Sequence, residues 1–243
     1  MIYSRLKIYL RKENPISNSI IFNDRYLIYS FILNAIRMKN PDLSDKIHSN
    51  KLPRAFVFSN IIPYKSYHIL YFTTPYKEVF NAFYSGLNRS SRLNDRNKMF
   101  NFNIVNTILE NFDISSYKHF NFLSPFLIRT KEKVLDEIDL NFFEKSISEG
   151  IKRVSTKLNI DVEDTNVKIN GTKDDFRKKL YVFKNSKNED VYIRAFSAKS
   201  PSVSISFNDD KAKAIALFYG IGDRTKLGFG MLGFKGGLGE GLQ

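Results

Sequence analysis

The chain has 243 residues, of which 42% are hydrophobic and 14% aromatic, so it can form substantial cores and is not a disordered protein. Its net charge of +13 indicates attraction to polyanions and says nothing about the fold. The absence of cysteine excludes disulfides, thiolate zinc sites and cysteine nucleophiles, and a total of three histidines argues against a histidine-rich metal site.

The sequence contains no run of about 18 apolar residues that would predict a membrane span. Its first residues alternate between apolar and charged side chains, unlike the apolar segment of a signal peptide. We therefore expect a cytoplasmic protein with no membrane partner, no metal and no cofactor.

The first half of the chain predicts the order β-α-β-β-α-β. Alternating residues 2–10 predict a strand, and "NDRYLIYSFILNAIRMKNP" predicts a helix that ends before Pro41. The polar segment "DLSDKIHSNKLP" after it predicts a loop. The remaining elements are two strands, a helix and a strand, predicted over residues 54–62, 66–74, 75–87 and 99–108.

The second half predicts a looser repeat of the same plan. Residues 119–130 predict a strand, residues 136–158 a long helix, residues 208–220 a short helix and residues 229–234 a closing strand. Between the two helices, three further strands are predicted over residues 179–185, 191–198 and 202–207. We expect an α+β protein of two tandem ferredoxin-like, RRM-like (βαββαβ) domains, covering residues 1–112 and 120–243.

The stretch "GIGDRTKLGFGMLGF", residues 220–234, holds five of the chain's twelve glycines. Glycines in such a cluster can stop a helix and shape the entry into a strand. A glycine-rich backbone also exposes N–H groups that bind anions, and Arg224 and Lys226 would add charge to such a site. The spacing matches neither a nucleotide-triphosphate P-loop nor a dinucleotide fingerprint. The pattern alone leaves both interpretations open.

This stretch resembles the C-terminal glycine-rich signature of the CRISPR repeat-processing endoribonucleases, which belong to the RAMP superfamily. That signature is Gly–apolar–Gly, an insert with Arg or Lys, and a second Gly–apolar–Gly. The segment "NAIRMKNPDLSDKIHSNKLPRAFVFS" also resembles the family's first helix, its His-bearing loop and its second strand. The resemblance implies that RNA binds the glycine-rich stretch, at Gly220, Gly222, Arg224, Lys226, Gly228 and Gly230.

The resemblance implies metal-independent RNA cleavage, in which the ribose 2′-OH attacks the adjacent phosphate and leaves a 2′,3′-cyclic phosphate and a 5′-OH. His48 matches the family's catalytic histidine, and an imidazole can exchange protons near neutral pH. Arg54 lies where the family often has a catalytic lysine, and Lys51 is a neighbouring cation that could also stabilise the transition state. His48 could instead be an ordinary loop histidine, and both cations ordinary surface charges.

The sequence departs from the family pattern on the first helix. Some members have a tyrosine there that assists the histidine, whereas the matching position here is Leu33. Tyr29 lies one turn earlier on the same helix face, and it either substitutes for the missing tyrosine or belongs to the core. His68, within a predicted strand, is a weaker candidate for a second histidine, and nothing favours His119.

Three hypotheses follow. The first is an endoribonuclease that binds CRISPR repeat RNA, the precursor crRNA, and cleaves it within each repeat. The second is an inactive RNA-binding subunit of a CRISPR effector complex, and the third is a basic α+β protein unrelated to CRISPR whose glycines are structural. Effector-complex subunits and a second copy of the chain are further candidate partners.

Overall fold

The computed structural model describes residues 1–12, 25–64, 66–87, 92–94, 101–128, 138–184, 190–198 and 203–234. The chain forms two compact units. The N-terminal unit consists of Ser4–Asn111 and Lys226–Gly228. The C-terminal unit consists of Met1–Tyr3, Phe112–Thr225 and Phe229–Gln243. Within the described ranges, no helix has the length and hydropathy to cross a membrane.

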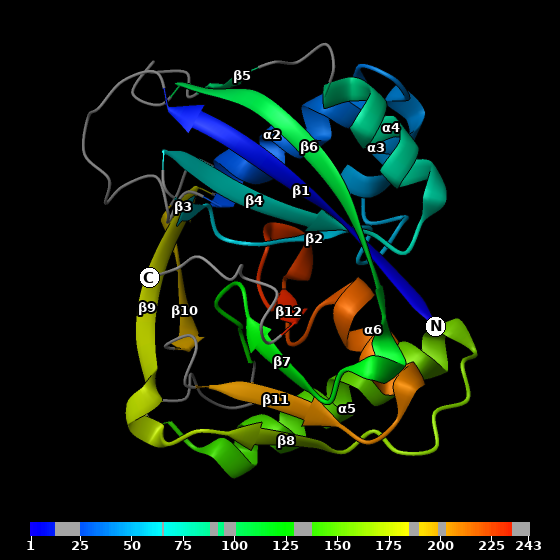
Figure 1. Cartoon of the computed structure of the whole chain (residues 1–243), viewed down its shortest axis with the longest axis vertical. Helices are drawn as coiled ribbons and strands as arrows, with labels where there is room; N and C mark the ends of the chain where they lie inside the picture. Colours follow the sequence, from blue (N-terminus) through cyan, green and yellow to red (C-terminus); the bar gives the residue numbers. More distant parts are fainter. Residues whose placement is uncertain are drawn as a thin grey trace. The chain divides into compact units, whose positions relative to one another are not determined.

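The N-terminal unit is built on a six-stranded sheet (Figure 1). Its order is β2-β4-β1-β6-β5, and β3 also pairs with β4. In the antiparallel pair of β1 and β4, Leu6 lies opposite Phe72 and Ile8 opposite Leu70. The strands are β1 (Ile2–Lys12), β2 (Val57–Phe58), β3 (Ile62–Tyr64), β4 (Tyr67–Thr73), β5 (Arg92–Asn94) and β6 (Asn101–Asp113).

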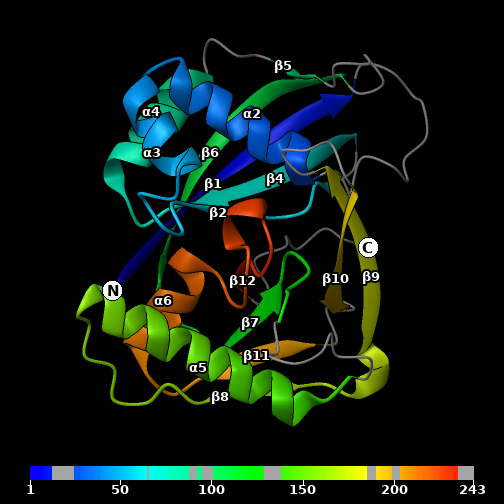
Figure 2. The same ribbon diagram turned by 180° about the vertical axis from the view of Figure 1, so that it is seen from behind.

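Helices α2 (Arg25–Arg37), α3 (Pro41–His48) and α4 (Lys77–Leu87) lie on one face of this sheet (Figures 1 and 2). The alternation in β1 buries Leu6, Ile8 and Leu10 completely beneath them. The helices α2 and α4 pack at a glycine, because a Cβ on Gly86 would lie 2.0 Å from the carbonyl oxygen of Ala35. The core of this unit therefore lies between one face of the sheet and the three helices, and α3 contributes Leu43 and Ile47 to it.

The prediction of a loop over residues 42–53 is wrong for its first residues, because the helix α3 occupies Pro41–His48. Pro41 ends one helix and starts the next, since a residue without an N–H is tolerated in a first helical turn. Asn40 caps the new helix by accepting a hydrogen bond from the backbone N of Leu43 at 3.0 Å. His48 is thus the last residue of a helix rather than part of a loop.

The C-terminal unit repeats the plan with a four-stranded sheet of order β12-β7-β11-β8. In each unit, the strands that come first and third in its β-α-β-β-α-β plan are central neighbours, which confirms the prediction of two tandem ferredoxin-like folds. Its elements are β7 (His119–Phe122), α5 (Leu140–Leu158), β8 (Val167–Asn170), β11 (Ser204–Phe207), α6 (Asp210–Tyr219) and β12 (Leu232–Phe234).

The prediction missed β8, whose four residues alternate between buried and exposed. Two of the predicted strands, β9 (Phe176–Lys184) and β10 (Asp190–Ala198), pair with each other in a separate two-stranded sheet. They form a hairpin inserted between β8 and β11. The strand predicted over residues 119–130 ends at Phe122, although Phe126 still forms a bridge with Phe196.

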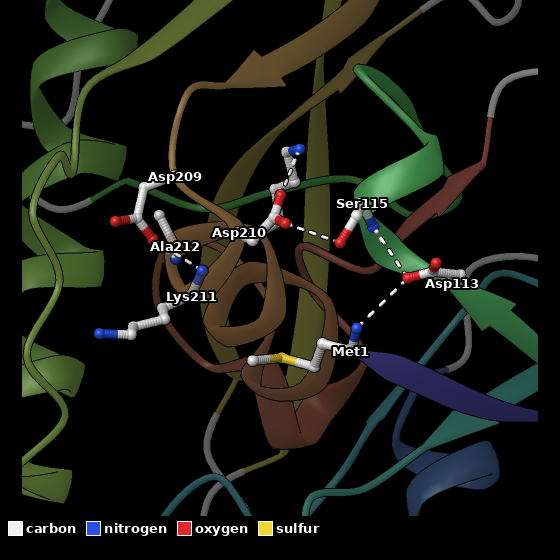
Figure 3. A network of polar contacts seen from close by, with 8 residues as sticks. Met1, Asp113, Ser115, Asp209, Asp210, Lys211 and Ala212 are labelled. Atoms are coloured by element: carbon white, nitrogen blue, oxygen red, sulfur yellow. Dashed lines mark hydrogen bonds and ion pairs between the residues drawn. The ribbon is translucent and has the colours of Figure 1, made fainter.

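A polar network fixes the start of α6 against the segment after β6 (Figure 3). Asp209 caps the helix by accepting hydrogen bonds from the backbone N of Lys211 and of Ala212. The Asp210 carboxylate accepts from the Ser115 hydroxyl and from the Lys213 ammonium, each at 2.7 Å. These two hydrogen bonds hold the pKa of Asp210 below its ordinary value, with the Lys213 bond contributing more.

Candidate nucleic-acid interface and active site

The glycine-rich stretch has a backbone that requires glycine. Gly220, Gly222, Gly228 and Gly230 all have φ between 70° and 78°, in the left-handed region. At Gly230 a Cβ would lie 1.9 Å from the carbonyl oxygen of Ile221, so the backbones approach closely there. The interpretation that these glycines shape the backbone is therefore correct. An additional role in anion binding is compatible with it.

The tip of this stretch, Lys226–Gly228, belongs to the N-terminal unit, although it begins more than one hundred residues after Asn111, where the rest of that unit ends. Arg25, the first residue of α2, donates hydrogen bonds from Nη1 to the carbonyl oxygens of Gly228 and Leu227. Its Nη2 donates to Oδ1 of Asn60. A Cβ on Gly228 would lie 2.2 Å from Cε2 of Phe58, so the tip is packed as well as hydrogen-bonded.

Lys226 reaches the segment that follows α3. Its Nζ donates a hydrogen bond to Oδ1 of Asn50 and lies 6.0 Å from the centroid of the Tyr29 ring. Burial lowers the pKa of the Lys226 ammonium below its ordinary value. A half-buried cation near an aromatic face interacts more strongly with an anion than the same cation in water does.

His48 lies at the exposed C-terminal end of α3, two residues before Asn50. Asn50 has a φ of 60°, and this left-handed residue turns the chain after the helix. Lys51 is exposed and its backbone N donates to the carbonyl oxygen of Lys46 at 2.9 Å. Arg54, half-buried and with a φ of 50°, follows before β2.

Tyr29 is buried, with 4% of its surface exposed, and its ring centroid lies 5.9 Å from that of Phe56 in the core. Burial raises the pKa of the Tyr29 phenol to about 12, and the neighbouring Tyr26 adds to the shift. The phenol therefore keeps its proton at neutral pH and is available as a donor rather than as a base. Leu33, one turn later, is half-buried and packs against the same core.

The predicted site residues fall into two groups. In the N-terminal unit, Lys226 lies near Tyr29, and Gly228 packs against Phe58. Lys226 also contacts Asn50, in the segment that carries His48, Lys51 and Arg54. Gly220, Gly222, Arg224 and Gly230 lie in the C-terminal unit. The other two histidines are placed apart from this segment along the chain: His68 in β4, packed 5.2 Å from the ring of Phe102, and His119 exposed at the start of β7.

Sequence reasoning missed Arg25 and Asn50. Nothing in the pattern singles out Arg25, because an arginine at the start of a helix is ordinarily exposed. Asn50 carried a weak signal, since asparagine is the non-glycine residue that most readily adopts a left-handed turn after a helix. In the part of the chain that the structure describes, no group of three or more His, Asp or Glu residues could hold a metal ion.

Comparison with known proteins gives a family match and a fold match. Residues 19–106 match the model of the N-terminal region of the CRISPR-associated protein Cas6. No curated protein sequence matches the chain. The structure is similar to a RAMP protein described as binding different RNA substrates, with a TM-score of 0.70 and 18% identity, over 96% of this chain and 99% of that one.

Two further solved structures are similar over almost their whole length. The product of a Cas6-related gene from Pyrococcus furiosus has a TM-score of 0.70 and 21% identity, covering 95% of this chain and 97% of that one. A CRISPR-associated protein Cas6 has a TM-score of 0.69 and 21% identity, covering 96% and 99%. The matched N-terminal region, together with this shared fold, confirms the resemblance to Cas6 proteins that the sequence shows.

Proposed function

We propose that the protein is a metal-independent endoribonuclease that binds CRISPR repeat RNA and cleaves precursor crRNA within each repeat. One observation carries the proposal. The tip of the glycine-rich stretch joins the N-terminal unit, and its Lys226 contacts Asn50, two residues after His48. An imidazole and a half-buried cation on neighbouring segments are the groups that cleavage of a phosphodiester by an internal nucleophile requires.

In the proposed reaction, the 2′-oxygen of the ribose forms a bond to the adjacent phosphorus as it loses its proton. The bond from phosphorus to the 5′-oxygen of the next nucleotide breaks, and that oxygen gains a proton. The products are a 2′,3′-cyclic phosphate and a 5′-OH, so no water is consumed. His48 exchanges a proton in this sequence, and a cation among Lys226, Arg54 and Lys51 neutralises charge on the phosphorane.

The net charge of +13 and the match of residues 19–106 to the Cas6 N-terminal model support RNA as the substrate. The similar RAMP protein is described as binding different RNA substrates, and another similar structure, with a TM-score of 0.59, is a Cas6 product complex. In our proposal the glycine-rich stretch, including Arg224, holds phosphates of the repeat. The protein acts alone, as a homodimer or with effector-complex subunits, and it works in the cytoplasm.

Cleavage of a labelled repeat RNA in excess EDTA tests this proposal. We expect wild-type cleavage to persist in the chelator and His48→Ala to lower the rate by about 10²–10⁴-fold, the usual contribution of a general acid or base. His119→Ala removes another exposed histidine and serves as the matched control, with an unchanged rate. Cleavage that stops in EDTA and returns with added metal would contradict the metal-independent mechanism.

A repeat RNA with one 2′-deoxy residue at the wild-type cut site tests the nucleophile. We expect this substrate to bind and to remain intact. If it is cleaved at the same bond, the internal 2′-OH is not the nucleophile.

The alternative is an inactive RNA-binding subunit of a CRISPR effector complex. The exposure of His48 and the absence of a tyrosine at Leu33 favour this alternative. It predicts tight binding of the repeat, no cleavage under any condition, and the same affinity in His48→Ala as in the wild type.

A further inference from the structure

Hydrogen bonds from Arg25, the first residue of α2, join that helix to the tip of the glycine-rich stretch, Lys226–Gly228. Arg25 is fully buried, with 1% of its surface exposed, and its guanidinium points at the backbone of the tip. A buried guanidinium is costly unless its donors are used, and carbonyl oxygens are good acceptors for it. Arg25 also contacts Asn60 and lies 6.0 Å from the centroid of the Phe58 ring.

The geometry of Gly228 makes this contact specific. A Cβ at residue 228 would lie 2.5 Å from Nη1 of Arg25 and 2.2 Å from Cε2 of Phe58. The arginine therefore reaches the tip's carbonyl oxygens only because residue 228 has no side chain. This close approach is a second reason for glycine there, besides its positive φ.

We call the hydrogen bonds from Arg25 to the carbonyl oxygens of Leu227 and Gly228 the clamp. Lys226 directly precedes these two residues, so the clamp restricts the backbone of Lys226. Its ammonium is then held at Asn50 and above Tyr29. Lys51, in contrast, is exposed to solvent. A preorganised, half-buried cation stabilises developing charge better than a mobile, hydrated one.

We propose that Arg25 is a positioning residue that clamps the glycine-rich tip, so that Lys226 serves as the catalytic cation of the His48 site. This inference rests on the proposed nuclease function. It assigns the cation to a residue that comes more than 170 positions after His48, in place of the neighbouring Lys51 and Arg54. Asn50 keeps the ammonium in place until a phosphate replaces it as the partner.

Single-turnover cleavage at saturating repeat RNA tests the assignment, with affinity measured separately. We expect Lys226→Met to lower the rate by about 10²–10³-fold, the usual effect of losing one transition-state donor. Arg25→Met should lower it to a similar extent, and the double variant should be no slower than Lys226→Met, because both changes remove the same interaction. Arg37→Met, at the exposed end of the same helix, is the matched control and should leave the rate unchanged.

Two results of this experiment would overturn the proposal. The first is a Lys226→Met rate equal to that of the wild type at saturating RNA, with weaker binding alone. The second is a double variant whose defect is the product of the two single defects. Gly228→Ala displaces the tip without changing a charge, and it should reproduce the Arg25→Met rate if the clamp is correct.

A second measurement does not depend on cleavage and so separates this inference from the nuclease proposal. Amine-selective labelling followed by mass spectrometry reports the accessibility of each lysine. We expect Arg25→Met to raise the labelling rate of Lys226 several-fold, while Lys7, whose side chain is 14% exposed in the same unit, stays protected. Unchanged labelling of Lys226, or a rise at Lys7 that shows unfolding of the whole unit, would overturn the clamp. If wild-type protein cleaves no RNA, the nuclease proposal fails and the labelling result still decides the clamp.

Discussion

The two units share the order of their four ferredoxin-like strands but differ in their first helical connection and in an inserted hairpin. In the N-terminal unit, the first helical connection is broken into α2 and α3, and the break places the end of α3 and His48 at the surface. In the C-terminal unit, the same connection contains the single helix α5, which has 19 residues, with Asp139 as its N-cap and a left-handed Asn159 as its C-cap. The extra material there is the β9–β10 hairpin. The ferredoxin-like plan is thus a common scaffold, and the candidate catalytic His48 lies where the N-terminal unit departs from it.

The reason for the different helices is local. Pro41 cannot continue α2, and Asn40, with φ of −147° and ψ of 89°, leaves the helical region and caps α3. No proline interrupts α5, and its amphipathic pattern buries Phe143, Ile147, Ile151 and Val154 along one side. A proline and an asparagine therefore give the N-terminal unit a second helix in this connection, which ends at His48.

The largest change in stability that we expect comes from a substitution in the core of the C-terminal unit, and it tests whether the two units unfold independently. Phe126 is fully buried, and its ring lies 5.0 Å from that of Phe122 and 5.3 Å from that of Phe143. Phe126→Ala should lower the free energy of unfolding by about 3–5 kcal/mol. Hydrogen exchange should show the loss of protection in β7 and α5. Equal loss in α2 and α4 would show that the two units do not unfold independently.

A smaller effect compares a glycine from each unit. Gly86→Ala places a methyl group against the backbone of Ala35 and should lower the free energy of unfolding by about 1–3 kcal/mol. Gly150→Ala, in the middle of α5, meets no atom within 4 Å and should raise it by about 0.5–1 kcal/mol, because alanine is the better helix former. Denaturant titrations of the two variants measure both changes. Equal destabilisation would mean that the helix pair of the N-terminal unit is not closely packed at Gly86.

The smallest expected effect is on the stability of the C-terminal unit at acidic pH. Three carboxyl groups with lowered pKa values, Asp113, Asp164 and Asp210, lie in the C-terminal unit. A lowered folded-state pKa gives stability that is present above the ordinary value of 3.8 and is lost as pH falls through the folded-state pKa. Asp210→Asn should therefore be less stable than the wild type at pH 6, by no more than about 1 kcal/mol. The difference should shrink below pH 3.8, and thermal melts at both pH values measure it; a constant difference would contradict the assigned cause.

Much of the fold could be predicted because its signals are local. Period-two alternation marked β1, and apolar residues at helical spacing marked α2, α4 and α5. The errors came where local signals are weak. The four residues of β8 are too few for a period to stand out, and the residues of α3 look like a polar loop because only Leu43, Ser44 and Ile47 are buried. The hairpin strands β9 and β10 had the right local pattern, but pattern alone does not assign a strand to a sheet.

The candidate site was predictable in part for the same reason. His48, Lys226 and the glycines stood out by residue type and by their resemblance to a family signature. Arg25 and Asn50 did not, because their importance depends on partners that are distant in sequence. The carbonyl oxygen of Gly228 lies 203 positions from Arg25, and the ammonium of Lys226 lies 176 positions from Asn50.

By itself, the sequence determined the α+β class, the repeated ferredoxin-like plan, the basic charge and a glycine-rich stretch with left-handed backbone. These properties follow from side-chain periodicity, composition and the steric freedom of glycine, which act between near neighbours. Only the tertiary structure decided that Lys226–Gly228 joins the N-terminal unit and that a buried arginine holds it there. Such a contact depends on the hydrogen-bonding needs of a desolvated guanidinium, and which distant backbone meets them is settled only when the chain is folded.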